Sequence, residues 1–354
     1  MSLPNDEMIS LRRFYALSRL TSFAKYASTF SSQGTIACPT LKGKNLDDMF
    51  SINEKELRSI LDISHSLKKR LRLNPSSYTP LVGRSMAMIF QKRSTRTRVS
   101  TESGFAQLGG HAIFLGSEDI QLGKNESMLD TAKTLSRFND VILARVYKHD
   151  DIVELCKHST VPVINALSDA HHPLQGLADL MTIEQHLRTT EGRTIAWIGD
   201  GNNILQTFLT MASIGRFHVR YATPKNYEPN SMIVDQAIKN AVAVGVSITA
   251  TNDPLEAVKG ADVVVTDTWV SMGMEKEELD RKKAFSGYQV TEDLCKRGGA
   301  KNDWKFLHCM PRKKEEVSDE VFYSSRSLVF DEAENRKWTV MAITLAQLLG
   351  GADL

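Results

Sequence analysis

The chain has 354 residues, and at about 150 residues per domain it is expected to fold as two domains, each with its own core. Lys and Arg total 44 and Asp and Glu total 42, so the formal net charge is +2, which argues against a protein that works chiefly on nucleic-acid backbones. Hydrophobic residues make up 42% and charged residues 24%, which argues against extensive disorder. The sequence contains no apolar run of about 18 residues, so it predicts no membrane span.

The cysteines are widely separated and form no CxxC pair, so neither a disulfide framework nor a zinc cluster is indicated. This distribution fits a reducing compartment. The cysteines are Cys38, Cys156, Cys295 and Cys309.

Residues 1–32 have the composition of an organelle transit peptide. No Asp or Glu occurs over 8–46, whereas Arg and Ser recur there, and apolar residues at helical spacing would form one face of a helix. We therefore predict a cleaved leader, with the mature chain starting after Phe23 and before Lys42. A disordered, mildly basic tail remains the alternative, because two acidic residues lie close to the start.

Strand-like and helix-like patterns alternate after the leader. Apolar residues at helical spacing predict a helix over 53–73, and HHPLQ followed by a helical pattern is where we expect the chain to pass between its halves. Helical stretches separate most of the candidate strands, which indicates an α/β fold with two doubly wound parallel sheets joined by helices. The candidate buried strands are 86–90, 111–115, 141–146, 163–165, 194–198, 218–222, 246–249, 263–266 and 305–308.

The run QKRSTRTRVS follows the first of these strands and precedes a helical pattern. A helix N-terminus offers free backbone N–H groups, and Ser94, Thr95, Arg96 and Thr97 add hydroxyl and guanidinium donors. This pattern predicts a phosphate-binding loop, although GxxxxGK[ST] is absent. A solvated basic turn or a nucleic-acid contact is the alternative, and the strand directly before the run favours the phosphate site.

Other polar residues also follow predicted strands, where ligands bind in open α/β sheets. Arg145 ends NDVILARV, His172 and Gln175 lie in HHPLQ, Asp267 follows VVVT, and Cys309 follows KFLH. Taken singly, each has an ordinary structural interpretation, such as a surface Arg or a helix-capping Asp. A thiol-protease interpretation of Cys309 lacks the surrounding motif of that class.

The segment TIAWIGDGNN contains half of a dinucleotide-binding fingerprint. Gly199 and Gly201 follow a strand, but Ile204 occupies the position of the third glycine, and the next strand ends without a ribose-binding acid. We therefore expect a tight strand-to-helix turn near a small ligand rather than an NAD site.

The motifs STRTR, HPLQ, DTWVSMG and HCMP, in that order, resemble the ornithine transcarbamylase family, from about Asp47 to the C-terminus. STRT alone would also fit aspartate transcarbamylases, and the later motifs select ornithine. The resemblance implies the transcarbamylase fold and transfer of the carbamoyl group of carbamoyl phosphate to the δ-amine of L-ornithine, giving L-citrulline and phosphate in arginine biosynthesis or the urea cycle. It further implies a homotrimer of the mitochondrial matrix with no cofactor, no metal, no nucleic-acid partner and no stable membrane association.

The resemblance also implies a division of the chain after the transit peptide. Residues 38–170 and 336–354 would form a carbamoyl phosphate-binding domain, and 171–335 an ornithine-binding domain. The C-terminal helix would pack back on the first domain.

For carbamoyl phosphate, the family's pattern assigns the phosphate to Ser94–Thr97, with Arg96 pairing with its oxygens. Arg145 and His172 would carry the oxyanion, Gln175 would accept from the NH2 group, and Gln121 would reach the neighbouring subunit's site. The complete set implied is Ser94, Thr95, Arg96, Thr97, Gln121, Arg145, His172, Gln175, Cys309, Met310 and Arg336. Met310 departs from the family, where Leu is usual.

For ornithine, the family's pattern implies Asn203, Asp267, Ser271 and Met272. Asp267 would bind the α-ammonium, and Asp267 with Cys309 would help the δ-amine lose its proton. The catalytic set implied is Arg145, His172, Asp267 and Cys309.

Three alternatives remain open. The first is a dehydrogenase, which would use GDGNN to bind NAD, and the second is a nucleic-acid binder, which would use KRSTRTR. The third is a transcarbamylase that acts on another amine, such as putrescine, or a family member that only regulates a partner. The intact DTWVSMG favours ornithine over putrescine, because putrescine has neither an α-carboxylate nor an α-ammonium.

Overall fold

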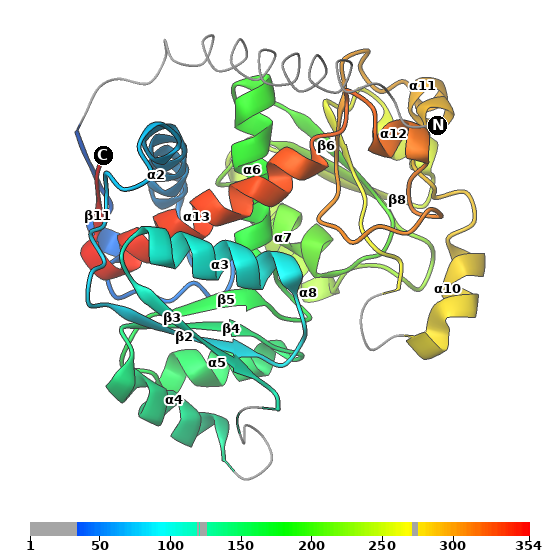
Figure 1. Cartoon of the computed structure of the whole chain (residues 1–354). Coiled ribbons are helices and arrows are strands. Elements are labelled where there is room, and N and C mark those ends of the chain that lie inside the picture. Colours follow the sequence, from blue (N-terminus) through cyan, green and yellow to red (C-terminus); the bar gives the residue numbers. More distant parts are fainter. Residues whose placement is uncertain (1–33, 119, 121–125, 271–274) are drawn as a thin grey trace, which may run out of the picture. The chain divides into compact units, whose positions relative to one another are not determined.

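The computed structural model describes residues 34–118, 120, 126–270 and 275–354. The predicted transit peptide, Gln121, Ser271 and Met272 lie outside these residues. Residues 36–352 belong to one compact unit, which contains both large sheets (Figure 1). Within the described residues, no helix is both long and apolar enough to span a bilayer.

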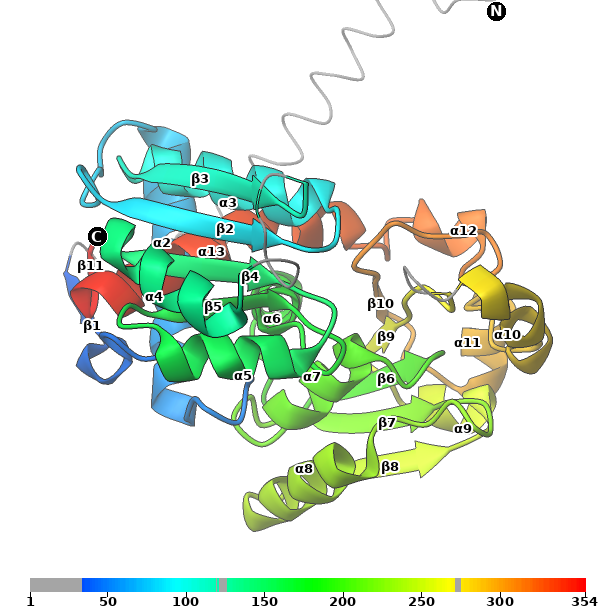
Figure 2. The same ribbon diagram turned by 90° about the horizontal axis from the view of Figure 1, so that it is seen from below.

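The first large sheet has four parallel strands in the order β3-β2-β4-β5. In Figures 1 and 2, helices α4 and α5 lie on one side of it, and α2, α3 and α13 lie on the other. The strands are β2 (Ser85–Phe90), β3 (His111–Gly116), β4 (Val141–Arg145) and β5 (Val163–Leu167). The helices are α2 (Glu54–Leu73), α3 (Thr95–Gln107), α4 (Met128–Phe138), α5 (His149–His158) and α13 (Val329–Leu349).

The second large sheet has five parallel strands in the order β10-β9-β6-β7-β8. Its strands are β6 (Thr194–Ile198), β7 (His218–Ala222), β8 (Ile248–Thr251), β9 (Val263–Val265) and β10 (Lys305–Leu307). The helices of this half are α7 (Asn203–Met211), α8 (Ser231–Ala243), α9 (Pro254–Val258), α10 (Glu278–Ala284), α11 (Glu292–Gly298) and α12 (Asp319–Phe322). Short elements complete the chain: β1 (Thr35–Ala37) pairs with β11 (Gly351–Asp353), and η1 (Pro39–Leu41) and η2 (Glu275–Glu277) are 3-10 turns.

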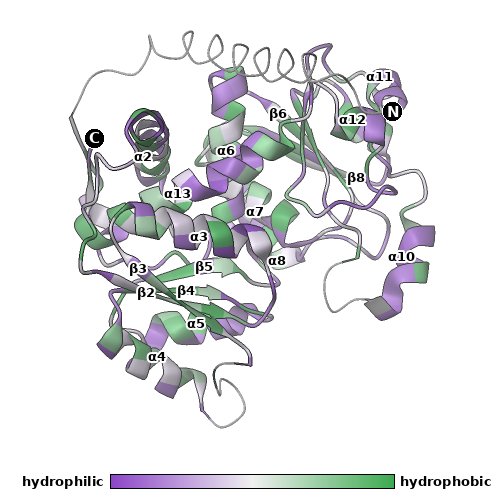
Figure 3. Cartoon of the chain, viewed as in Figure 1, coloured by the Kyte–Doolittle hydropathy of each residue, from purple (hydrophilic) through white to green (hydrophobic). Residues whose placement is uncertain are grey.

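Both faces of the first sheet are covered at its central strand β2, as its alternating side chains show. In β2, Met86 and Met88 belong to the largest core, whereas Ala87 and Ile89 pack with α4 and α5. Hydrophobic residues on both faces are typical of parallel strands between two helical layers. In Figure 3, hydrophobic colour runs along β5, and hydrophilic colour dominates the outlying α10.

Two long helices connect the halves. Helix α6 (Pro173–Leu187) packs against α13, and α13 also packs against α2 and α3. The predicted return of the C-terminal helix to the first sheet's helices is therefore confirmed. Since α6 is buried along most of its length, its polar side chains must find partners inside the protein.

Local signals in the sequence explain where the helices near the site begin. Asn53 caps α2 in a reciprocal capping box with Glu56, so the predicted helix begins one residue after the start expected for it. Ser94 caps α3, because its Oγ accepts a hydrogen bond from the backbone N of Thr97 at 3.2 Å. The predicted phosphate loop therefore lies at the N-terminus of a helix.

All nine predicted strands are present, but two of them are not buried. Every residue of β3 and β8 is exposed or half-buried, and β8 begins at Ile248 rather than at residue 246. Both are edge strands with a single neighbour, so part of their surface stays open. Hydrophobic runs in the sequence do not show which strand lies at an edge.

Candidate active site

The predicted phosphate loop meets residues from the far end of the chain. Arg96 donates a hydrogen bond to the backbone O of Met310, and Arg336 Nη2 donates to Thr97 Oγ1 at 3.0 Å. The start of α3, the segment after β10 and helix α13 therefore converge on one place, which brings together Arg96, Thr97 and Arg336, three of the residues that the resemblance implies.

Three guanidinium groups gather around this loop. Arg145 ends β4 and Arg336 lies on α13, and both are almost fully buried, whereas Arg96 is half-buried. Burial, together with the charges of Arg336 and Arg96, lowers the pKa of Arg145 to about 10. Burial also lowers the pKa of Arg336 to about 10. Both side chains stay charged at neutral pH, so the site concentrates positive charge.

Some buried polar atoms here have no hydrogen-bond partner within the described part of the chain. They are Nε of Arg145, Nε of Arg336 and Nδ1 of His172. Buried polar groups are almost always satisfied in folded proteins, so their clustering beside three cations indicates a site for an anionic, oxygen-rich ligand.

His172 stands just before the first turn of α6 and is buried. Its backbone N donates to Thr207 Oγ1 at 2.8 Å, which ties the start of α6 to α7. Burial lowers the pKa of His172 well below its usual value, and Arg336, Arg145 and Arg96 add repulsion in the same direction. The imidazole is therefore neutral at physiological pH.

Gln175 is held from two sides. Its Oε1 accepts from Arg336 Nη1 at 2.7 Å, and its Nε2 donates to Asp179 Oδ1 at 2.7 Å and to Glu332 Oε1 at 2.6 Å. The sequence analysis did not single out Asp179 or Glu332. The only available signal was an acid one helical turn after Gln175 in a largely apolar helix, and Glu332 is distant in the chain.

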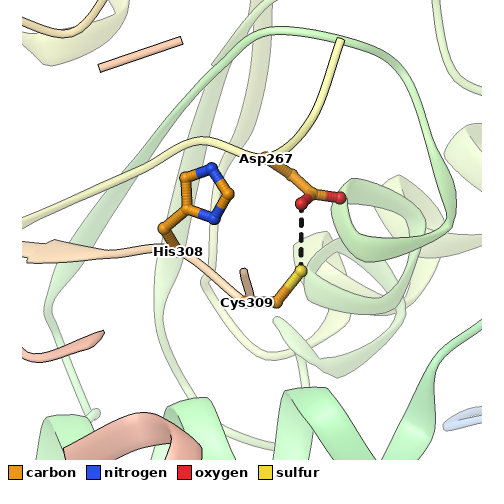
Figure 4. Close-up of side chains that lie close together, drawn as sticks. All are labelled: Asp267, His308 and Cys309. Carbon is orange, nitrogen blue, oxygen red and sulfur yellow. Dashed lines mark hydrogen bonds between the residues drawn. The ribbon is translucent and has the colours of Figure 1, made fainter. Parts of the chain in front are cut away.

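Asp267 and Cys309, two of the residues that the resemblance implies, lie in contact (Figure 4). Cys309 Sγ donates to Asp267 Oδ1 at 2.9 Å, while Asn202 Nδ2 donates to Asp267 Oδ2 at 2.8 Å. Burial raises the pKa of Cys309 well above its usual value, and the charge and the hydrogen bond of Asp267 raise it further. Cys309 is therefore a thiol, not a thiolate, when no ligand is bound.

The two asparagines of GDGNN have different partners. Asn203, the predicted ornithine ligand, donates from Nδ2 to the backbone O of Ser168 at 2.6 Å. Its neighbour Asn202, which the sequence analysis did not single out, caps α7 and holds Asp267. Gly199 has φ +143°, a backbone conformation that favours glycine, in the short connection between β6 and α7.

Met310 takes part through its backbone. It has φ +56°, its N donates to His308 Nδ1 at 2.9 Å, and its carbonyl O accepts from Arg96. His308 Nε2 lies 3.2 Å from Glu316 Oε2, so the buried acid supports the imidazole that holds Met310. The change from Leu to Met at this position leaves these backbone contacts possible.

Asp267, His308 and Cys309 could together offer ligand atoms to a metal ion, because one such atom from each lies within 4.8 Å of the others. The Cys309 thiol would have to lose its proton first, and one Asp267 oxygen already accepts that proton's hydrogen bond. In this structure Cys309 instead donates to Asp267, and His308 Nδ1 accepts from the backbone N of Met310.

Comparison with known proteins agrees with this geometry. The carbamoyl-P binding domain of aspartate/ornithine carbamoyltransferases matches residues 44–185, and the Asp/Orn binding domain of the same family matches 191–347. The mitochondrial ornithine transcarbamylase of Gallus gallus is 49% identical over 346 residues, 96% of each chain.

Solved structures are similar as well. The ornithine carbamoyltransferase of Pyrococcus furiosus has 43% identity and a TM-score of 0.83, over 88% of this chain and 99% of that one. The mitochondrial ornithine carbamoyltransferase of Coccidioides immitis has 43% identity and a TM-score of 0.80, over 88% of this chain and all of that one. The chain belongs to the aspartate/ornithine carbamoyltransferase family.

Proposed function

We propose that this chain transfers the carbamoyl group of carbamoyl phosphate to the δ-amine of L-ornithine, giving L-citrulline and phosphate, as in arginine biosynthesis and the urea cycle. The relatives named ornithine carbamoyltransferase support this reaction over that of the aspartate enzymes. Asp267 supports it too, because a carboxylate in the second half of the site suits an ammonium and not a second substrate carboxylate.

The observation that carries the proposal is the convergence of Arg96, Arg145 and Arg336 on the N-terminus of α3. Phosphate would lie against the donors of Ser94 to Thr97, where backbone N–H groups and the helix dipole favour an anion. Arg96 would neutralise the leaving phosphate, and Nε of Arg336, which has no partner among the described residues, would bind a further oxygen.

In the proposed mechanism, Arg145 and His172 stabilise the oxyanion that forms as the carbamoyl carbon becomes tetrahedral. The neutral state of His172 suits this role, because an uncharged imidazole can donate a hydrogen bond without further repulsion among the arginines. Gln175 would accept from the carbamoyl NH2 group. Rate enhancement would then come from positioning and charge stabilisation.

The amine side of the proposed site is built on Asp267 and Cys309. Asp267 would bind the α-ammonium of ornithine, with Asn203, Ser271 and Met272 completing the pocket. The δ-ammonium has a pKa of roughly 10 in water and must lose a proton before it attacks. Because Cys309 already carries its proton, the Asp267 carboxylate would be the member of the pair that accepts the proton from the δ-ammonium.

We further propose that the chain works as a homotrimer of the mitochondrial matrix, with Gln121 contacting the site of a neighbouring subunit. The mitochondrial names of its relatives support the compartment. The proposed domains are 38–170 with 336–354 for carbamoyl phosphate and 171–335 for ornithine.

The phosphate assignment is tested by Arg96→Ala. A hydrogen bond to a charged group contributes about 1.5–3 kcal/mol, so the KM for carbamoyl phosphate should rise about 10- to 150-fold. Arg98→Ala is the matched control, since Arg98 lies on the same turn of α3 but pairs with Glu102 at 3.0 Å. Unchanged saturation in Arg96→Ala, or an equal loss in both variants, would contradict the assignment.

A further inference from the structure

Two acidic side chains lie buried behind Gln175. Asp179 on α6 and Glu332 on α13 are each 1% exposed, and both accept hydrogen bonds from the same atom, Nε2 of Gln175, at 2.7 and 2.6 Å. Glu332 Oε2 also accepts from the backbone N of His308 at 2.9 Å, directly before Cys309. The two acids therefore join α6, α13 and the end of β10.

Two carboxylates this close in a buried place cannot both be ionised at low cost. Burial raises the pKa of Asp179, and burial together with the charge of Asp179 raises the pKa of Glu332 well above its usual value. The other charges that face them are Arg336, which favours the ionised form of Asp179, and Asp267, which opposes it. A pair that shares one proton, with one negative charge opposite Arg336, satisfies all of these constraints.

The surroundings of Gln175 allow only one orientation of its amide. Arg336 can only donate, so it must face Oε1, and the acceptor oxygens of Asp179 and Glu332 must face Nε2. An amide oxygen has two lone pairs. Arg336 uses one of them, and the other stays available for a donor on the substrate.

We propose that Asp179 and Glu332 are a positioning pair that shares one proton and fixes the Gln175 amide with its oxygen toward the substrate. As a result, the site prefers an acyl phosphate that carries an N–H donor. This inference rests on the proposed function, in which Gln175 contacts the carbamoyl NH2 group. Acetyl phosphate has the same shape but carries a methyl group there, and so cannot donate to Oε1. The pair thus contributes to selectivity for carbamoyl over acetyl groups.

The test measures Kd values for carbamoyl phosphate and acetyl phosphate by calorimetry on the folded wild-type protein and on two variants. Asp179→Leu removes one of the two acceptors of Nε2 and leaves the amide held by Glu332 and Arg336 alone. The amide oxygen is then less firmly fixed, so the Kd ratio of acetyl to carbamoyl phosphate should fall, by up to about tenfold, the value of one hydrogen bond. Asp179→Asn can still accept from Gln175 and donate to Glu332, as a protonated acid would, and should keep the wild-type ratio.

Glu184→Gln is the control, because it removes another buried carboxylate of α6 that bonds to Arg58 and His65 instead. It should lower stability and leave the ratio unchanged. An unchanged ratio in Asp179→Leu, or an equal fall in Asp179→Asn, would overturn the inference. Binding measurements do not require turnover, so a wild-type protein that binds both ligands but makes no citrulline would refute the proposed function separately.

A measurement on the wild-type protein covers the case in which Asp179→Leu fails to fold. Infrared spectra should show the carbonyl band of a protonated carboxylic acid that persists at pH 8, where Asp200, whose pKa burial raises to about 6, is already ionised. Absence of this band at pH 8 would rule out the shared proton.

Discussion

Replacing Asp267 by Asn keeps the shape of the side chain and removes its charge. Asp267 accepts from Cys309 Sγ at 2.9 Å and from Asn202 Nδ2 at 2.8 Å, so the amide can retain at most one of these contacts through its single oxygen. Losing a charge-assisted hydrogen bond to the α-ammonium would cost about 1.5–3 kcal/mol. We therefore expect kcat/KM for ornithine to fall about 10- to 150-fold, with little change in the Kd for carbamoyl phosphate.

A second readout follows from the Cys309 thiol. Because Asp267 raises the pKa of Cys309, Asp267→Asn should lower it, and iodoacetamide should alkylate Cys309 faster at a fixed alkaline pH. Initial-rate kinetics with both substrates varied, together with mass-spectrometric mapping of the alkylated cysteine, measure the two effects.

Asp262→Asn is the matched control, because this buried acid stands just before β9 and pairs with Arg193 and Lys301. It should lower the melting temperature without changing the kinetics of ornithine. Asp267→Asn with a normal kcat/KM for ornithine and an unchanged rate of Cys309 alkylation would refute the assignment of Asp267 to the amine site.

Three further predictions concern packing, stability and pH. A Cβ on Gly201 would lie 2.3 Å from the backbone C of Glu228. Gly201→Ala should therefore lower the free energy of unfolding by about 1–3 kcal/mol and lower the melting temperature. An unchanged melting temperature would contradict this close approach. Burial alone would raise the pKa of Glu184, but hydrogen bonds from His65 and Arg58 lower it below 4.5. The free energy of unfolding lost in Glu184→Gln at pH 7 should therefore shrink as the pH falls below 4.5. Urea unfolding that shows an equal loss at pH 7 and below pH 4.5 would count against this. The rate of citrulline formation should rise from about pH 6 to about pH 9 as bound ornithine loses its proton. His172 should not titrate in that range, because its pKa lies well below its usual value. A rate that does not change with pH over this range would contradict the prediction.

Much of the fold could be predicted from the sequence because its signals are local. Most strands of the two sheets are short, mainly apolar runs, and the start of α2 is set by a capping box within four residues. The exposure of β3 and β8 could not be predicted, because the order of strands in a sheet depends on contacts distant in the chain.

The candidate site, too, could be predicted from the sequence only in part. Motif order brought Arg96, Arg145 and Arg336 into one hypothesis, and the structure gathers them around the N-terminus of α3. Asp179 and Glu332 escaped the analysis because acids in helices are usually solvated, and only the packing of α6 against α13 buries them together.

Asn202 was missed for a related reason. It stands beside the residue that the family's pattern selected, and either asparagine could have faced the site from a strand-to-helix turn. Only the position of Asp267 after β9 shows that Asn202 is its partner.

The most direct test of the proposed reaction is product formation by protein lacking residues 1–32. Carbamoyl phosphate is supplied with L-ornithine, putrescine or L-aspartate, and citrulline and the other carbamoylated products are separated and quantified. We predict citrulline from ornithine and no product from the other two amines. Product from putrescine or aspartate would contradict the assignment of Asp267, and no product from any amine would contradict the proposed reaction itself.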